Sequence, residues 1–119
     1  MTTDPPRPGK LGRAGAALWD RLTAELDFEG HELLILGEAA RTADTCADLQ
    51  RILDAEGPLD VSPHGKRAHP ALVELRAQRL TLARLLVALR LPTGVEGETA
   101  PVAAREQRRG GIRGVYGVN

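Results

Sequence analysis

The chain has 119 residues and a mass of 12.8 kDa, with 16 basic and 16 acidic side chains and a formal net charge of zero. This length supports one domain with one small core and excludes a multidomain protein. The single cysteine, Cys46, excludes an internal disulfide and a cysteine-rich zinc site. No run approaches the roughly 18 apolar residues of a membrane span, and the first ten residues lack the apolar stretch of a signal peptide. We therefore expect a soluble, intracellular protein with no membrane partner.

Aromatic residues make up only 3% of the chain, so the core has to be built from leucine, alanine and valine. This composition favours helices over sheets. We expect an all-α fold of three core helices, with a short hairpin or an irregular loop before the last helix. The expected divisions are a disordered N-terminal arm at 1–10, a helical core and oligomerisation domain at 11–92, and a flexible C-terminal tail at 93–119.

The first two helices are predicted from apolar residues that recur at spacings of three and four. The first helix should run over about 13–26, and the second over about 31–55. Asp27 or Glu29 lies near the start of the second helix, where a carboxylate meets unpaired backbone amides. The pair Gly57-Pro58 ends it.

Segment 59–68 separates the second helix from the third. It has short extended pieces around a Pro-His-Gly turn, which predict a small β-hairpin or an irregular loop. Pro70 suits the first turn of a third helix. That helix should continue to about Leu91, before Pro92 ends it.

The predicted third helix carries two apolar stripes on different faces. One stripe consists of leucines and is interrupted by Arg79, and the other consists of Val73, Leu80 and Val87. Two apolar faces need two partners, so we expect one face to pack within the protomer and the other against a neighbouring subunit. The alternative is a helix that is central in its own fold. The leucine stripe contains Leu72, Leu75, Leu82, Leu86 and Leu89. We assign the oligomer interface to Leu75, Arg79, Leu82 and Leu86.

No set of residues indicates catalysis, a metal site or a cofactor. Segment 9–15, GKLGRAG, is rich in glycine but matches no phosphate-binding spacing and follows no strand, so we interpret it as a loop and helix start. The three histidines lack a helical i,i+4 pair or nearby ligands at metal spacing. Cys46 lies on an apolar helix face with no local base, which is typical of a buried small hydrophobe. We therefore expect no enzymatic activity, no metal and no cofactor.

Charge is distributed in blocks along the chain. Residues 25–56 carry nine acidic and two basic side chains, whereas 57–91 carry six basic and two acidic ones. Such blocks let identical copies attract one another and let a basic surface face a polyanion. Because few aromatics are available for stacking, DNA affinity should be weak in one copy and raised by repetition in an oligomer. The candidate DNA contacts are Lys10, Arg13, Lys66 and Arg67.

Several short segments, taken in chain order, carry a resemblance to a known protein family. They are Leu11-Gly12-Arg13-Ala14-Gly15 followed by Leu18-Trp19, then Ala40-Arg41-Thr42-Ala43-Asp44, and finally His69-Pro70-Ala71-Leu72 with Glu74-Leu75-Arg76 and Gln78-Arg79. Together they resemble the small terminase subunits of tailed bacteriophages. The ending, Leu82-Ala83-Arg84-Leu85-Leu86 and Leu89-Arg90-Leu91-Pro92, is similar to the way the last core helix of that family runs into its tail. The resemblance covers about residues 11–92 and departs from the family in the loop Pro63-His64-Gly65-Lys66-Arg67.

The resemblance implies a non-catalytic DNA-packaging protein that forms a homo-oligomeric ring of about eight to ten subunits. Such a protein recognises double-stranded viral DNA at a packaging site in the cytoplasm of the bacterial host cell. It also recruits and regulates the large terminase subunit, which holds the ATPase and the nuclease. The tail combines basic and apolar residues, which suits a segment that folds on a partner such as the large subunit. The docking residues assigned to it are Arg108, Arg109, Ile112 and Tyr116. The alternative hypotheses are a small dimeric DNA-binding transcriptional regulator and a structural helical adaptor protein.

Overall fold

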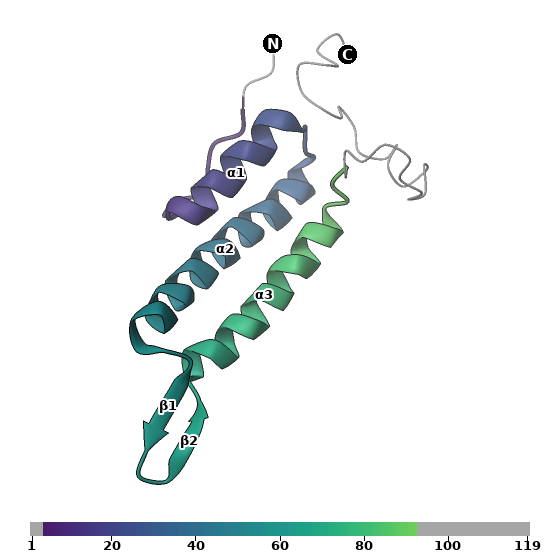
Figure 1. The fold of residues 1–119 in the computed structure, drawn as a ribbon. Helices are drawn as coiled ribbons and strands as arrows, with labels where there is room; N and C mark the ends of the chain where they lie inside the picture. Colours follow the sequence, from purple (N-terminus) through teal and green to yellow (C-terminus); the bar gives the residue numbers. More distant parts are fainter. Residues whose placement is uncertain (1–3, 93–119) are drawn as a thin grey trace.

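In the computed structural model, which describes residues 4–92, the chain forms three helices and one two-stranded hairpin (Figure 1). The elements in chain order are α1 (Arg13–Glu25), α2 (Gly30–Glu56), β1 (Leu59–Ser62), β2 (Gly65–Ala68) and α3 (Pro70–Ala88). The prediction of three helices is confirmed, and the hairpin is the correct one of the two structures predicted before the last helix. The fold is therefore mostly helical with a small antiparallel sheet, rather than strictly all-α.

The helices begin and end close to the predicted positions, for local reasons. Glu29 and Glu32 form a reciprocal capping box at the start of α2, in which the Glu29 amide donates to Glu32 Oε1 at 2.7 Å. Gly57 follows α2 with a φ of 85°, a conformation that favours glycine. The third helix ends at Ala88, three residues before its predicted end, and Arg90 then takes a φ of 54°.

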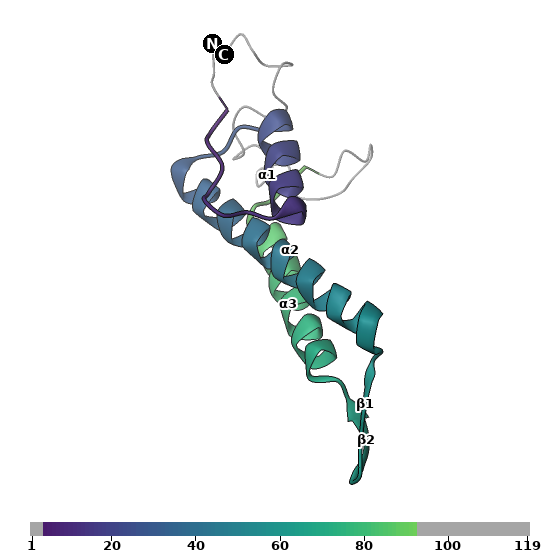
Figure 2. The same cartoon turned by 90° about the vertical axis from the view of Figure 1, so that its left-hand side faces the viewer.

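The central helix is α2, and α1 and α3 both pack against it (Figures 1 and 2). The first residues of α1 lie beside the middle of α2, so α1 covers only the first half of that helix. The second half of α2 pairs with α3 and leads into the hairpin, which projects beyond the helices. The Cα radius of gyration is 18.0 Å, whereas a compact chain of this size has about 12 to 14 Å. The molecule is elongated, and its interior is small.

Two clusters of buried side chains hold the helices together. The first cluster joins α1, α2 and the residue that follows α3, and the second joins α2 and α3 near the hairpin. The first consists of Trp19, Leu36, Ala40 and Leu89, and the second of Leu53, Ala71 and Leu75. Each cluster is formed by a few side chains, so the loss of one of them should be felt strongly.

The two apolar stripes of α3 lie on different faces, and the leucine face that the sequence assigns to the oligomer interface packs against the core of the same chain. Leu75 is 1% exposed within the second cluster, Leu86 packs against the first cluster, and Leu82 is half-buried. On the same side, Arg79 Nη2 donates to Gln50 Oε1 of α2 at 2.7 Å. This face therefore meets α2 within a single chain. The leucines of this face remove more apolar area from water than the other stripe would, so their burial in the core is favoured.

The other stripe of α3 faces solvent. Val73 is 57% exposed, Leu80 53% and Val87 75%. These residues are seven positions apart, so they lie on one side of the helix, one above the other. The elongated chain thus has a continuous apolar stripe that no other described residue buries.

The structure describes residues 4–10 of the arm that the sequence predicts to be disordered, and it places them against α1 and α2. Arg7 donates from Nε and Nη2 to the two carboxylate oxygens of Asp20, at 2.9 and 2.5 Å. These hydrogen bonds hold the pKa of Asp20 below its ordinary value. Trp19 Nε1 donates to the carbonyl oxygen of Pro5 at 3.4 Å. Arg41 of α2 donates from Nη1 to the carbonyl oxygen of Gly9 at 3.3 Å, so the arm contacts both α1 and α2.

Two neighbouring leucines of α2 test the placement of the core. Leu36 is 0% exposed and Leu34 is 75% exposed. Leu36→Ala should lower the free energy of unfolding by about 2 to 5 kcal/mol, because it leaves a cavity in the first cluster. Leu34→Ala should change it by no more than about 0.5 kcal/mol. Urea unfolding followed by far-UV circular dichroism measures both values, and equal losses in the two variants would contradict the fold.

Candidate nucleic-acid interface

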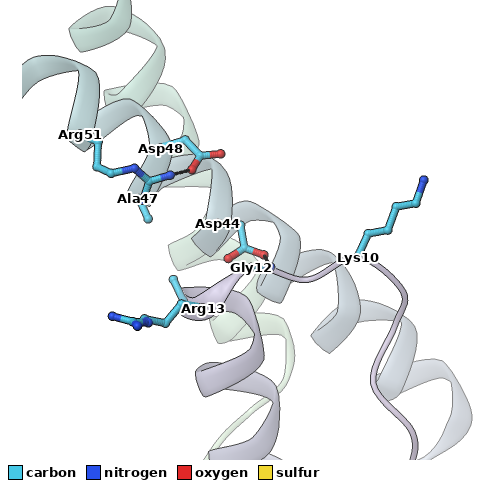
Figure 3. Close-up of a pocket in the computed structure, with 8 residues that line it drawn as sticks. Lys10, Gly12, Arg13, Asp44, Ala47, Asp48 and Arg51 are labelled. Atoms are coloured by element: carbon cyan, nitrogen blue, oxygen red, sulfur yellow. Dashed lines mark hydrogen bonds and ion pairs between the residues drawn. The ribbon is translucent and has the colours of Figure 1, made fainter.

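The candidate site lies where the start of α1 meets the middle of α2 (Figure 3). The backbone amides of Gly12 and Gly15 donate to Asp44 Oδ2 and Oδ1, each at 2.7 Å. Gly12 is the N-cap residue of α1 and has no side chain that could accept from the first turn, so a carboxylate from α2 does this instead. A negative charge at this helix end is also favoured by the helix dipole. The cap fixes the position of α1 along α2.

Two glycines make this contact possible. A Cβ atom on Gly15 would lie 2.4 Å from the carbonyl oxygen of Ala40 and 2.5 Å from Asp44 Oδ2. A Cβ atom on Gly12 would lie 2.9 Å from Asp44 Oδ1. Because such distances are too short for non-bonded atoms, α1 can approach α2 only with glycine at these positions. The interpretation of segment 9–15 as a loop and helix start is confirmed, and its glycines serve close packing.

The cap limits how a nucleic acid could bind here. A free helix N-terminus attracts phosphate, because its backbone amides and its dipole both favour an anion. In this chain the amides of Gly12 and Gly15 are already bound to the carboxylate of Asp44, which would also repel a phosphate. Contacts with a phosphate backbone at this end of α1 therefore have to come from side chains.

Three cationic side chains border a shallow pocket beside the cap. Lys10 and Arg13 extend away from the pocket in different directions (Figure 3), and both are exposed. Neither forms an ion pair with any other residue between 4 and 92. Arg51 of α2 is paired with Asp48, one turn earlier. Lys10 and Arg13 therefore offer charge to a polyanion, whereas the charge of Arg51 is offset by its neighbour.

The other two candidate cations lie on the hairpin, at the far end of the molecule (Figure 1). In the antiparallel register Lys66 is opposite Val61 and Arg67 is opposite Asp60. Arg67 Nε lies 3.6 Å from Asp60 Oδ2 and is partly neutralised, whereas Lys66 forms no ion pair within the described part of the chain. A single chain therefore separates the four candidate cations into two groups rather than forming one basic surface.

His69 connects the end of α2 with the start of α3. Its Nδ1 accepts from the amide of Ala71 at 2.9 Å, so the proton of the neutral ring lies on Nε2, which is 2.6 Å from Glu56 Oε1. The His69 amide also donates to the carbonyl oxygen of Pro58 at 2.9 Å. His69 is the N-cap residue of α3, and its contacts fix the base of the hairpin.

The described residues contain little else that suggests chemistry. Within residues 4–92 no group of three or more histidine, cysteine and acidic side chains is placed to hold a metal ion. No helix in that range is both long and apolar enough to cross a membrane. Cys46 packs against the second cluster, and burial raises the pKa of its thiol, which suits a packed side chain better than a nucleophile.

No family model matches the sequence, and no curated protein or solved structure is significantly similar to it. Segments 11–15 and 40–44 meet in the Asp44 cap, and segment 69–72 contains the His69 cap. Sequence reasoning missed the role of Asp44. The available signal was a glycine at the start of a predicted helix, since that position needs an acceptor from elsewhere.

Gly15→Ala tests the close approach of α1 to α2, with Gly30→Ala as its matched control. Alanine is the better helix former at both positions, and nothing lies within 4 Å of a Cβ atom on Gly30. Gly15→Ala should lower the free energy of unfolding by about 1 to 3 kcal/mol through steric overlap, whereas Gly30→Ala should leave it unchanged or raised. Thermal and urea unfolding measure the difference. A stabilised Gly15→Ala variant would show that α1 does not pack as described.

Proposed function

We propose that the chain is a DNA-packaging protein of the small terminase type, a non-catalytic subunit of a homo-oligomeric ring. In this role it binds double-stranded viral DNA at a packaging site and recruits and regulates the large terminase subunit. Its place of action is the cytoplasm of the bacterial host cell. The proposal starts from the resemblance of residues 11–92, and two of the segments that carry it supply the contact that fixes α1 on α2.

The observation that carries the proposal is the exposed apolar stripe of α3 on an elongated chain. Val73, Leu80 and Val87 are each more than half exposed, and the hairpin adds Leu59 and Val61 at 52% and 69%. An isolated two-stranded hairpin is only marginally stable in water. A chain with so small an interior and so much open apolar surface is suited to assembly with further copies. The oligomer surface of the proposal is therefore the Val73, Leu80 and Val87 face.

An oligomer also explains how two small groups of cations could serve DNA binding. Lys10 and Arg13 at one place, and Lys66 with the partly neutralised Arg67 at another, supply few phosphate contacts in one chain. A ring repeats both groups around its circumference, so the contacts add along one duplex and raise its affinity. Zero net charge per chain is compatible with this, because the contacts depend on local exposed cations.

The assignment of the tail to docking on the large subunit remains part of the proposal. Its residues, Arg108, Arg109, Ile112 and Tyr116, lie outside the described range. The regulator hypothesis is less well supported. It needs a recognition helix whose first turn faces DNA, whereas α2 begins with the acidic capping box of Glu29 and Glu32.

Binding of a fluorescent duplex, followed by anisotropy at several salt concentrations, tests the DNA function. We expect salt-sensitive binding by the full chain, and a weaker affinity with a shallower salt dependence for the Lys10→Ala/Arg13→Ala variant. Arg21→Ala is the control, because Arg21 is an exposed arginine of α1 that is neither a candidate DNA contact nor part of the oligomer surface. No binding at low salt would favour the structural adaptor. An equal loss in the control would remove Lys10 and Arg13 from the interface.

A further inference from the structure

We propose that the exposed stripe of α3 in one copy packs against the uncovered second half of α2 in the next copy. The surface of α2 that takes part lies on the same side of the helix as α1, which covers only the first half. This inference rests on the proposed oligomer and names the two surfaces that meet in it. Each of the two surfaces is covered by another copy of this chain. The contact therefore joins two different surfaces of the same protein.

The receiving surface follows from the position of the Asp44 cap. Asp44 faces α1, and residues four, seven and eleven positions later share its side of α2. These residues are Asp48, Arg51 and Ala55, all of them exposed, and Ile52 beside them is 39% exposed. Because α1 begins next to Asp44 and runs toward the start of α2, no other helix between residues 4 and 92 covers this side.

The docking surface is the stripe of Val73, Leu80 and Val87, with the small exposed residue Ala77 between the first two. The stripe is about 21 Å long at 1.5 Å per residue. The uncovered part of α2 from Asp44 onward is about 18 Å long by the same measure. The two surfaces are thus matched in length, and the α2 surface combines the ion pair of Asp48 and Arg51 with the exposed Ile52.

The charges of α3 and α2 favour a contact between these two different helices over a contact between two copies of α3. Arg79 binds Gln50 of its own chain, but α3 also carries the exposed Arg76 and Arg84 against one acidic residue, Glu74, so its open side is basic. Two α3 helices in contact would bring these cations together. The second half of α2, over 45–56, has three acidic residues and one basic residue, so it attracts α3. A contact between unlike surfaces repeats from copy to copy and closes into a ring when its rotation allows.

Two single variants, mixed, test this arrangement in the full chain. Leu80→Asp damages the stripe of α3, Ile52→Asp damages the surface of α2, and Leu34→Asp is the control on an exposed part of α2 outside the contact. We expect each of the first two variants to lose assembly and run as a single chain on a sizing column with light scattering. The control should keep the mass of the unmodified protein.

The equimolar mixture of Leu80→Asp and Ile52→Asp gives the decisive result. One variant keeps an intact α2 surface and the other an intact α3 stripe, so the mixture should form a species of twice the 12.8 kDa of one chain and no larger one. A mixture that stays monomeric, or an Ile52→Asp variant that assembles fully, would overturn the pairing. The oligomer and its DNA binding would then still stand, through a different contact.

A second pair of changes covers the case in which an aspartate variant fails to fold, as judged by circular dichroism. Arg76→Glu/Arg84→Glu changes only exposed side chains of α3. It should dissociate the assembly at moderate salt, because it places acidic side chains against the acidic half of α2. Full assembly of this double variant would also overturn the pairing. An unmodified chain that is monomeric at every concentration would overturn the proposed oligomer itself.

Discussion

The carboxylate of Asp44 at the start of α1 is the contact on which the rest of the structure depends. It replaces the missing side-chain cap of Gly12 and, with Gly15, requires that α1 lie almost in contact with the backbone of α2. The cap sets where α1 begins, and therefore how much of α2 remains uncovered. It also removes the helix end from the possible phosphate sites, so that binding there depends on the exposed side chains of Lys10 and Arg13.

A second cap at the opposite end of α2 has a related effect. His69 joins the amide of Ala71 to the carboxylate of Glu56, and so holds the hairpin in line with the helix pair. The hairpin cations are consequently kept far from the cations near α1. Under the proposed function, this separation would make a single chain a weak binder of DNA, whereas a ring would carry two rows of cations at different heights. The same rigidity leaves α3 with one face in the core and one face open.

Much of the fold follows from the sequence, because periodicity, proline positions and capping residues act locally. The three helices, the hairpin and the His69 cap are of this kind. Long-range contacts were not predictable in the same way. Periodicity shows two apolar stripes on α3 but cannot tell which one meets α2, and in the structure it is the leucine stripe with Leu75 that does so. The prolines predict a disordered arm. The pairing of Arg7 with Asp20 spans 13 residues, so local sequence patterns do not show it. At the candidate site the cations were visible in the sequence, whereas the role of Asp44 required the three-dimensional contact.

The native mass of the full chain, measured alone and with duplex DNA at low and moderate salt, tests the central claim most directly. The exposed stripe of α3 and the two separate groups of cations fit the proposed function only if the chain forms an oligomer with a high copy number. We expect a mass near eight to ten copies of 12.8 kDa, on the order expected for a closed ring, and DNA binding that weakens as salt is raised. A monomer that does not bind DNA at low salt would contradict it, and a dimer that binds DNA tightly would favour the regulator instead.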